Sequence, residues 1–537
     1  MAYVITQRCC NDASCVSECP VDCIRPRPDD PEFATAEMLY IDPDTCIDCG
    51  ACFEACPVGA VYAEEDLPPA LARYPEINAG YFQRHPLEAD VTPPAPQRRL
   101  PRDREPLRVA IVGTGPAACY AAEHLLGTGR VEVEMFDRLP TPWGLVRYGV
   151  APDHSETRGV ADMFTAAFKR DALRMHLNTE IGIHLTHDDL LANCHAVLYA
   201  VGASADRRLG IPGEELPGSH AGTDFVAWYN GHPDHAGHTF DLSGERAVVV
   251  GNGNVALDIA RVLTADPEYL ARTDIADHAL AALRRSSIRE VTVLARRGPL
   301  EAAYTAAEFL ALRHLPGVDV VIDPADLAGL TADGHAPEWK LRLAREYAEQ
   351  PRTDGNRRIR FAFHSAPIEL GGTGRVETLT TARTEQVGGG TRITGHRETL
   401  DTALVLRAIG YRGEPVPGLP FDEAAGIVPN DGGRVAPGVY VSGWIKRGPR
   451  GVIGSNRADA AETVRALLDD FTAGHLTTPA PDRETFAELI RERNPDVVDR
   501  AGWQLLDQAE RTRGAAAGRP RVKIASVEEL LATARGR

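Results

Sequence analysis

Residues 107–118, L-R-V-A-I-V-G-T-G-P-A-A, contain a short apolar strand that runs directly into a glycine-rich turn. The turn has the pattern G-x-G-x-x-A at Gly113, Gly115 and Ala118, and helical sequence follows it. The next strand, V-E-V-E-M-F, ends at Asp137. Such glycines let the backbone approach a pyrophosphate, the helix N-terminus stabilises its charge, and the carboxylate binds a ribose hydroxyl. The stretch therefore predicts a parallel α/β dinucleotide-binding fold.

The same arrangement recurs at residues 247–263, A-V-V-V-G-N-G-N-V-A-L-D-I-A-R-V-L, where Gly253 and Ala256 lie in the turn. The next strand, V-T-V-L-A, ends in Arg296 and Arg297 instead of an acid. Guanidinium groups at this position favour a 2′-phosphate, although an arginine pair at a strand end also suits a solvated corner. We therefore expect FAD at the first turn and NADP at the second.

Two cysteine runs occupy the start of the chain, C-C-N-D-A-S-C-V-S-E-C-P at 9–20 and C-I-D-C-G-A-C-F-E-A-C-P at 46–57. The spacing of the second run is the one that bacterial-type ferredoxins use to hold iron-sulfur clusters. Zinc sites usually pair two C-x-x-C units across a longer gap, and a reducing cytosol argues against disulfides. The cysteines therefore predict iron-sulfur clusters and the transfer of single electrons.

In two-cluster ferredoxins the fourth cysteine of each run ligates the other cluster. The first cluster, of the 4Fe-4S type, would then take Cys19, Cys46, Cys49 and Cys52. The second would take Cys15, Cys56 and either Cys9 or Cys10, because the first run has lost the regular spacing. Three thiolates suit a 3Fe-4S cluster and a fourth ligand would suit a 4Fe-4S cluster, so both types stay open. The segment resembles the seven-iron ferredoxins, with Cys23 left over as a buried free thiol.

Composition narrows the class of protein. The chain has 58 basic and 76 acidic residues, a formal charge of −18, which makes nucleic acid a poor partner. No stretch approaches eighteen consecutive apolar residues, so we expect no membrane span. Residues 1–60 hold three Arg, no Lys and eleven acidic residues, a net charge of −8. Two explanations are equally favoured: the acidic residues dock on a basic surface, or they form a solvated face. Without a secretory segment at the start, we expect a cytoplasmic location.

The order of these segments predicts the domain boundaries. We expect an iron-sulfur domain over residues 1–65 and a linker rich in Pro and charge over 66–106, with apolar anchors at Tyr74, Ile77, Tyr81 and Phe82. Beyond it, short apolar runs alternate with helical patterns, as in a parallel sheet covered by helices.

From residue 107 onward the chain resembles adrenodoxin reductase and its bacterial ferredoxin-NADP reductase relatives. The phrases that carry the resemblance are P-T-P-W-G-L-V-R-Y-G-V-A-P-D-H at 140–154, G-N-G-N-V-A-L-D-I-A-R at 251–261, R-R-G-P-L-E-A-A-Y-T at 296–305 and G-W-I-K-R-G-P-R-G-V-I-G-S-N at 443–456. The resemblance implies an α/β fold with two Rossmann-like domains, an NADP domain (207–402) inserted into an FAD domain (107–206 and 403–537), here preceded by a small α+β ferredoxin domain.

The resemblance also implies site residues. FAD would be bound by Ala117, Asp137, Leu145, Trp444, Gly451, Val452 and Ile453. NADP would be bound by Arg207, Asn254, Val255, Arg296, Arg297 and Glu308. The family often has Glu where this chain has Asp137, so a ribose contact through water is one option. His154 and Glu308 are the ionisable groups that we expect in the active site, although most such residues orient or support a site.

These features together imply a ferredoxin-NADP reductase that moves electrons between NADPH, FAD and its own clusters, and on to a soluble ferredoxin or a cytochrome P450-type acceptor. NADPH gives up two electrons together, whereas an iron-sulfur cluster accepts one at a time. A flavin can take two electrons and release them singly, so it can connect the two. One alternative is an electron-input subunit like the small subunit of glutamate synthase. Another is a flavoprotein reductase whose N-terminal domain only docks a partner.

Overall fold

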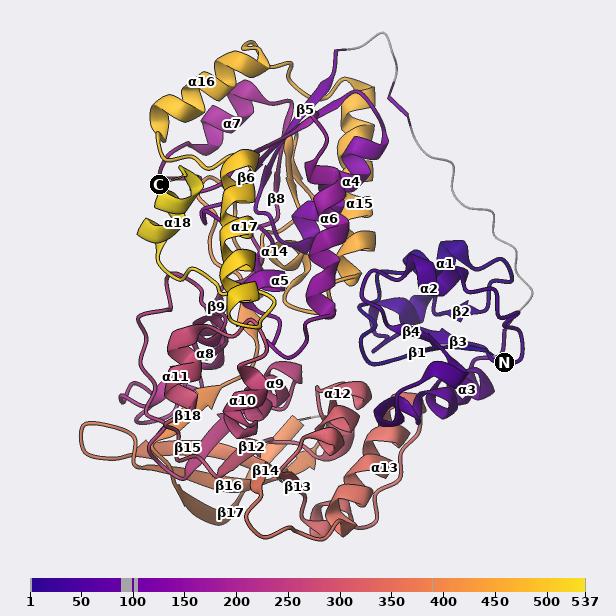
Figure 1. Ribbon diagram of the computed structural model, residues 1–537, viewed down its shortest axis with the longest axis vertical. Coiled ribbons are helices and arrows are strands. Elements are labelled where there is room, and N and C mark those ends of the chain that lie inside the picture. Colours follow the sequence, from indigo (N-terminus) through magenta and orange to yellow (C-terminus); the bar gives the residue numbers. More distant parts are fainter. Residues whose placement is uncertain (1, 88–98, 101–104, 389, 537) are drawn as a thin grey trace.

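The computed structural model describes residues 2–87, 99–100, 105–388 and 390–536. Figure 1 shows two stacked lobes with a small N-terminal domain lying beside their junction. Most of the proline-rich run predicted as a linker falls outside the described residues. Among the described residues, no helix is both long and apolar enough to cross a bilayer.

The N-terminal domain is a small α+β unit built on two antiparallel strand pairs, β1 (Tyr3–Ile5) with β4 (Val61–Ala63) and β2 (Ile24–Arg25) with β3 (Tyr40–Ile41). Two short helices, α1 (Ser14–Glu18) and α2 (Ala51–Ala55), carry part of the cysteine runs. A third, α3 (Tyr74–Arg84), lies in the segment expected to be a linker. The buried side chain of Asn78 bonds to the backbone of β1 and β3, so α3 is part of this domain.

The upper lobe, which we call the outer domain, contains a six-stranded sheet that is parallel except at one edge. Its strand order is β20 (Arg434–Ala436), β21 (Val439–Val441), β8 (Ala196–Tyr199), β5 (Leu107–Val112), β6 (Val131–Phe136) and β7 (Leu173–His176). The main helices around it are α4 (Pro116–Gly127), α6 (Val160–Phe168), α15 (Ser455–Ala473), α16 (Arg483–Arg493) and α17 (Arg500–Ala516). Its central strands are buried except at Arg108 and Glu132, which are partly exposed, as expected for parallel strands covered on both faces.

The lower lobe, the inserted domain, lies in sequence between β8 and β21. Its all-parallel sheet has the order β10 (Ser219–Ala221), β18 (Leu404–Arg407), β11 (Arg246–Val250), β12 (Glu290–Leu294), β14 (Arg357–Ala362) and β13 (Val318–Val321). Helices α8 (Gly222–Tyr229), α9 (Asn254–Thr264), α12 (Ala306–Ala311) and α13 (His335–Glu349) pack around it. An antiparallel meander, β15 (Ser365–Gly371), β16 (Thr378–Val387) and β17 (Gly390–Asp401), extends it.

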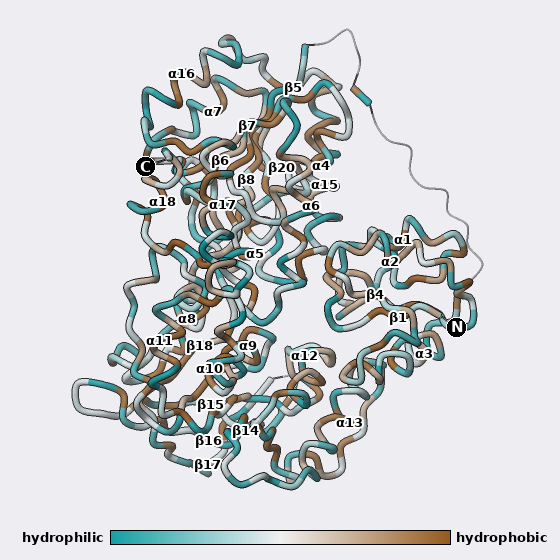
Figure 2. Tube along the Cα trace, in the orientation of Figure 1, coloured by the Kyte–Doolittle hydropathy of each residue, from teal (hydrophilic) through white to brown (hydrophobic). Residues whose placement is uncertain are grey.

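The chain passes between the two domains at β9 (Ala205–Asp206) and β19 (Tyr411–Arg412), which pair with each other. The second passage was expected at residue 403, which is a few residues too early, because β18 still pairs with β10 and β11. Figure 2 shows the hydrophobic residues concentrated in the strands of both sheets. The predicted α/β class is confirmed. A small α+β domain is followed in the sequence by two domains that each have a mainly parallel sheet and a dinucleotide-type turn.

Candidate active site and iron-sulfur sites

The first glycine-rich turn lies between β5 and α4. Gly113 has a φ of +107°, and a Cβ there would lie 2.4 Å from the carbonyl oxygen of Ala200. A Cβ at Gly115 would meet nothing within 4 Å, so the turn is open at the N-terminus of α4. This shape fits a pyrophosphate, because the backbone is free to approach it and the helix dipole favours its charge.

Asp137 follows β6 at this turn and is partly buried. Its carboxylate accepts hydrogen bonds from the backbone N–H of Thr114 (3.1 Å) and of Leu139 (3.0 Å), so it supports the turn directly. Burial raises the pKa of Asp137 because it disfavours the charged form. Its contact with a ribose hydroxyl stays a prediction.

Three distant segments of the chain meet at the first turn. A Cβ at Gly144 would lie 3.2 Å from the Cα of Gly115, which sets α5 (Leu145–Tyr148) against the turn with Leu145 partly exposed. A Cβ at Gly443 would lie 2.7 Å from the Cβ of Ala117, so Trp444 follows directly beside the start of α4. The structure therefore brings together the predicted FAD residues from three separate parts of the sequence.

The second turn lies between β11 and α9 and repeats the geometry of the first. Gly251 has a φ of +120°, and a Cβ there would lie 2.2 Å from the carbonyl oxygen of Ala408. Gly253 precedes α9, whose first residues are Asn254, Val255 and the buried Ala256, and the Asn254 side chain accepts the N–H of Thr305 at 2.8 Å. The helix therefore presents its N-terminus to the open turn.

The predicted cationic groups near this second turn are exposed. Arg296 and Arg297 follow β12, and both side chains lie at the surface. Arg207 is also exposed and lies at the passage between the domains, beside Gly410. The arginine pair is thus at the end of the strand next to the turn, where an adenosine 2′-phosphate would be expected.

The two predicted ionisable groups, His154 and Glu308, come from different domains and meet, with 3.7 Å between His154 Nε2 and Glu308 Oε2. Arg261, buried in α9, lies between them, with Nη1 at 2.6 Å from His154 Nε2 and 3.4 Å from Glu308. Arg261 also forms ion pairs with Asp153 and Asp258, each at 2.9 Å. Burial raises the pKa of Asp258 to about 6. A buried charge network thus joins the two domains beside the second turn.

Sequence reasoning missed Arg261 as a member of this site. The signal was available, because Asp258 and Arg261 are three residues apart in G-N-G-N-V-A-L-D-I-A-R and must share one face of the helix that follows the turn. His154 lies next to Asp153 in the A-P-D-H phrase. What the sequence could not show is that these two short segments meet.

The N-terminal domain gathers five thiols around one small cavity, and four of them are the ones predicted for the first cluster. The lining includes Cys19, Cys46, Cys49 and Cys52. Cys23 also lines it, and its Sγ lies 3.5 Å from that of Cys19, whose pKa the Cys23 thiol lowers to about 6. Cys49 is exposed, so this site opens toward the surface. Four convergent thiols fit a 4Fe-4S cluster.

A second thiol group contains Cys9, Cys15 and Cys56. Burial raises the pKa of Cys15 well above its ordinary value, and the neighbouring charges of Cys9 and Cys56 raise it further. Backbone N–H groups of Leu39 and Ala60 point at the sulfurs of Cys9 (3.4 Å) and Cys56 (3.2 Å). Iron ligation would deprotonate these thiols, and such N–H donors would stabilise the resulting sulfur charge.

This three-thiol group lies against the outer domain. The carbonyl oxygen of Cys10 accepts the N–H of Gly454 at 2.7 Å, directly after the predicted FAD turn 451–453. The buried Asp12 accepts the hydroxyl of Tyr120 in α4 at 2.7 Å and pairs with Arg457 at 3.3 Å. The three-thiol group is therefore the one next to the first turn, and the four-thiol cavity opens to the surface.

Comparison with known protein families divides the chain in the same way. The family described as 4Fe-4S binding domain matches residues 39–62. The family described as pyridine nucleotide-disulphide oxidoreductase matches residues 107–322. The two matches cover the second cysteine run and both glycine-rich turns.

Relatives of known name cover the whole chain. A protein of Mycobacterium leprae named as a ferredoxin/ferredoxin--NADP reductase is 47% identical over 100% of this chain and 98% of its own. The mitochondrial NADPH:adrenodoxin oxidoreductase of Bos taurus is 40% identical over 79% of this chain and 91% of its own. Among solved structures, Mycobacterium tuberculosis FprA in complex with NADPH is 46% identical with a TM-score of 0.79, covering 80% of this chain and 100% of that chain.

Proposed function

Since the chain belongs to the family of ferredoxin-NADP reductases that carry their own ferredoxin domain, we propose that it is an NADPH-dependent oxidoreductase that moves electrons between NADPH, FAD and its own iron-sulfur clusters. The observation that carries the proposal is the contact between the Cys10–Asp12 segment and Gly454, which sets one thiol group beside the first dinucleotide turn. Bound FAD would supply the exchange between paired and single electrons.

The residues of this chain bind and orient the cofactors. We assign FAD to the first turn and to the segments that meet it: Gly113, Gly115, Ala117, Ala118, Asp137, Leu145, Trp444, Gly451, Val452 and Ile453. We assign NADP to the second turn and its surroundings: Arg207, Gly253, Asn254, Val255, Ala256, Arg296, Arg297 and Glu308. In this assignment His154 and Glu308, both partly exposed, and the buried Arg261 hold the nicotinamide end in a charged environment.

We assign a 4Fe-4S cluster to Cys19, Cys46, Cys49 and Cys52, and a 3Fe-4S cluster to Cys9, Cys15 and Cys56. The choice of three thiols follows the resemblance to the seven-iron ferredoxins; Cys10 is buried beside Cys9 and Cys56, and its ligation would give a 4Fe-4S cluster instead. Electron paramagnetic resonance of the oxidised protein tests this assignment. A 3Fe-4S centre gives a signal there, whereas an oxidised 4Fe-4S centre of the ferredoxin type is silent.

The onward acceptor is a soluble ferredoxin or a cytochrome P450-type protein. The four-thiol cavity opens to the surface beside the exposed side chains of Ile47 and Phe53, which gives an acceptor access to it. Seven of the eleven cysteines are assigned to clusters and no disulfide links the described cysteines; this usage suits a reducing compartment, and we therefore place the enzyme in the cytoplasm.

Stopped-flow spectroscopy of the purified holoprotein tests the internal route. NADPH should bleach the flavin band first and the cluster absorbance second, with no added ferredoxin. If the clusters stay oxidised while an added carrier is reduced, the N-terminal domain only docks a partner and the internal route is wrong.

Replacing Arg296 and Arg297 by Ala tests the NADP assignment. Losing the 2′-phosphate contacts should raise the KM for NADPH by about tenfold or more and leave that for NADH unchanged, because NADH has no 2′-phosphate. Arg313→Ala, an exposed arginine of the same domain paired with Glu346, is the matched control. Equal losses with both nucleotides would refute the assignment.

A further inference from the structure

The turn that follows α8 in the inserted domain carries three histidines, one at every third position. Residues 231–238 read G-H-P-D-H-A-G-H, with His232, His235 and His238. The N–H of His235 bonds to the carbonyl oxygen of His232, and the N–H of His238 to that of His235, both at 3.0 Å. Such i→i+3 bonds place side chains three residues apart over one another. Successive ring centroids are accordingly 5.1 and 5.0 Å apart.

The first turn of α8 adds a carboxylate to two of these rings. Asp224, His235 and His238 each offer a ligand atom, and the three atoms lie within 4.8 Å of one another. Asp224 Oδ1 and His235 Nδ1 are 3.5 Å apart. A tetrahedral zinc ion with bonds of about 2.1 Å holds neighbouring ligand atoms about 3.4 Å apart. Asp224 and His235 are therefore already at ligand spacing, and only the exposed side chain of His238 has to close in by rotation.

One nitrogen of this group lacks a partner. His235 Nδ1 is buried and forms no hydrogen bond with a described residue, and its contact with Asp224 is too poorly aligned to be one. Burial lowers the pKa of His235, so the ring is neutral near pH 7 and does not form an ion pair with the carboxylate there. Because water does not reach this nitrogen, its partner has to be held by the side chains around it. A metal ion shared with Asp224 meets that condition.

The turn lies at the junction of the outer and inserted domains. Asn230, which ends α8, donates to the carbonyl oxygen of Tyr148 in the outer domain at 3.1 Å. The ring centroid of His232 lies 4.8 Å from that of Tyr148. Asp234 pairs with Arg138 of the outer domain at 2.6 Å. A ligand that orders residues 232–238 therefore also orders a contact between the two domains.

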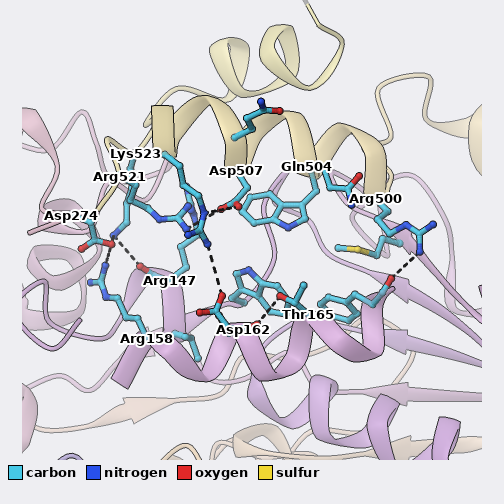
Figure 3. A pocket seen from close by; sticks show the side chains of 18 of the residues that line it. Arg147, Arg158, Asp162, Thr165, Asp274, Arg500, Gln504, Asp507, Arg521 and Lys523 are labelled. Carbon is cyan, nitrogen blue, oxygen red and sulfur yellow. Dashed lines mark hydrogen bonds and ion pairs between the residues drawn. The ribbon is translucent and has the colours of Figure 1, made fainter. Parts of the chain in front are cut away.

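This contact is weaker than others of the same junction. Figure 3 shows one of them, the ion pair between Arg158 and Asp274, whose side chains are only 12% and 9% exposed. In the pair between Arg138 and Asp234 the side chains are 46% and 43% exposed, so water weakens it. The turn is thus a part of the junction to which a metal bond would add much.

From this arrangement we propose that Asp224, His235 and His238 bind a zinc ion, with water as the fourth ligand. Two imidazoles and a carboxylate form a donor set that suits zinc, and the exposure of His238 leaves room for the water. None of the three residues is assigned to FAD, NADP or a cluster. The bound ion ties the turn to the start of α8 and so fixes its contact with the outer domain.

Isothermal titration of the holoprotein with zinc chloride tests the site. We expect one ion to bind with a Kd of about 1 µM or lower. His238→Gln and Asp224→Asn should each weaken binding by about tenfold or more, whereas His396→Gln, at an exposed histidine of β17, should not. Retained flavin content shows that a variant is folded. Unchanged affinity in both ligand variants, or binding only at millimolar zinc, overturns the proposal.

Hydrogen exchange followed by mass spectrometry tests the role at the junction. Zinc should slow the exchange of amides in residues 231–238 by about tenfold or more in the unaltered protein, and should not do so in His238→Gln. Amides around His396 should exchange at the same rate with and without zinc. Unchanged exchange in the turn, at a zinc concentration that saturates the titration, refutes the tie between the turn and α8.

Discussion

The N-terminal domain touches the rest of the molecule in two places that differ in kind. Its contact with the outer domain is buried and specific: Tyr120 and Asp12 are both buried, and Gly454 donates its N–H to Cys10. Its contact with the inserted domain combines a buried apolar part, where His335 lies edge-on to Tyr40, with ion pairs between α3 and α13 that are exposed, such as Arg342 with Glu76. Exposed pairs of this kind contribute about 0–1 kcal/mol each.

The difference between the two contacts indicates which of them sets the distance between the three-thiol group and the flavin site. The buried contact fixes the three-thiol group beside the first turn, and small displacements there change the approach to the flavin site. The exposed pairs align α3 along α13 but tolerate rearrangement, because long charged side chains can follow a moving partner. Disrupting the first contact should therefore slow internal electron transfer, and disrupting the second should not.

Gly454→Ala should have the largest effect. A Cβ at this position would lie 2.1 Å from the carbonyl carbon of Asn11 and 2.2 Å from the nitrogen of Asp12, so one backbone must move away. Reduction of the clusters by NADPH in the stopped-flow instrument should slow by about tenfold or more, equivalent to a barrier increase of about 1.4 kcal/mol. Reduction of the flavin should keep its rate.

The matched control is Gly127→Ala. A Cβ there meets nothing within 4 Å, and alanine at the end of α4 is favourable for a helix. It should leave both rates unchanged. If Gly454→Ala also leaves the clusters fully competent, the contact with the outer domain does not control the transfer.

Tyr120→Phe should have the next largest effect. It removes the 2.7 Å hydrogen bond to Asp12 and leaves a buried carboxylate oxygen with one partner fewer, at a cost of about 2 kcal/mol in the free energy of unfolding. Urea denaturation measures this loss, and cluster reduction should slow as well. Tyr440→Phe, which loses a similar bond to Asp470 far from the contact, should lower stability alone. Equal slowing in both variants would contradict the comparison.

The parts of the fold that sequence predicted best are those fixed by local geometry. A glycine-rich turn after an apolar strand needs only a few neighbouring residues, so both dinucleotide turns were found at the right positions. The four thiols predicted for the first cluster lie around one cavity, as the ferredoxin spacing led us to expect, and their ligation of iron stays a prediction.

What sequence could not predict depends on contacts between distant segments. Residues 74–84 were assigned to a linker, but Tyr81 stacks on Tyr40 at 4.3 Å, and Asn78 binds two strands. The approach of Asp12 to Tyr120, 108 positions away, has no local signal at all. Docking of one domain on another is decided by complementary surfaces, which a pattern in one segment does not contain.

Lys340→Met should have a moderate effect, because this ion pair is the most buried one of the second contact. The Lys340 Nζ lies 2.7 Å from Glu37, with exposed side-chain fractions of 9% and 17%, and Glu37 also accepts the N–H of Ala306. Because Glu37 keeps some contact with water, leaving this carboxylate without its cation should cost about 1 kcal/mol of unfolding free energy, the upper end of the range for exposed pairs. The double variant Lys340→Met with Glu37→Gln should recover most of it. No recovery would show that the lysine acts through packing alone.

Arg342→Gln should have the smallest effect. Its partner Glu76 lies 2.6 Å away, but the two side chains are 48% and 57% exposed, so water and salt already screen the pair. The loss should be about 0.5 kcal/mol or less, and 0.5 M NaCl should abolish it. Arg284→Gln, which breaks the exposed pair with Glu268 away from the N-terminal domain, should behave alike. If Arg342→Gln instead slows cluster reduction as strongly as Gly454→Ala, the exposed pairs share control of the electron route, and the distinction between the two contacts fails.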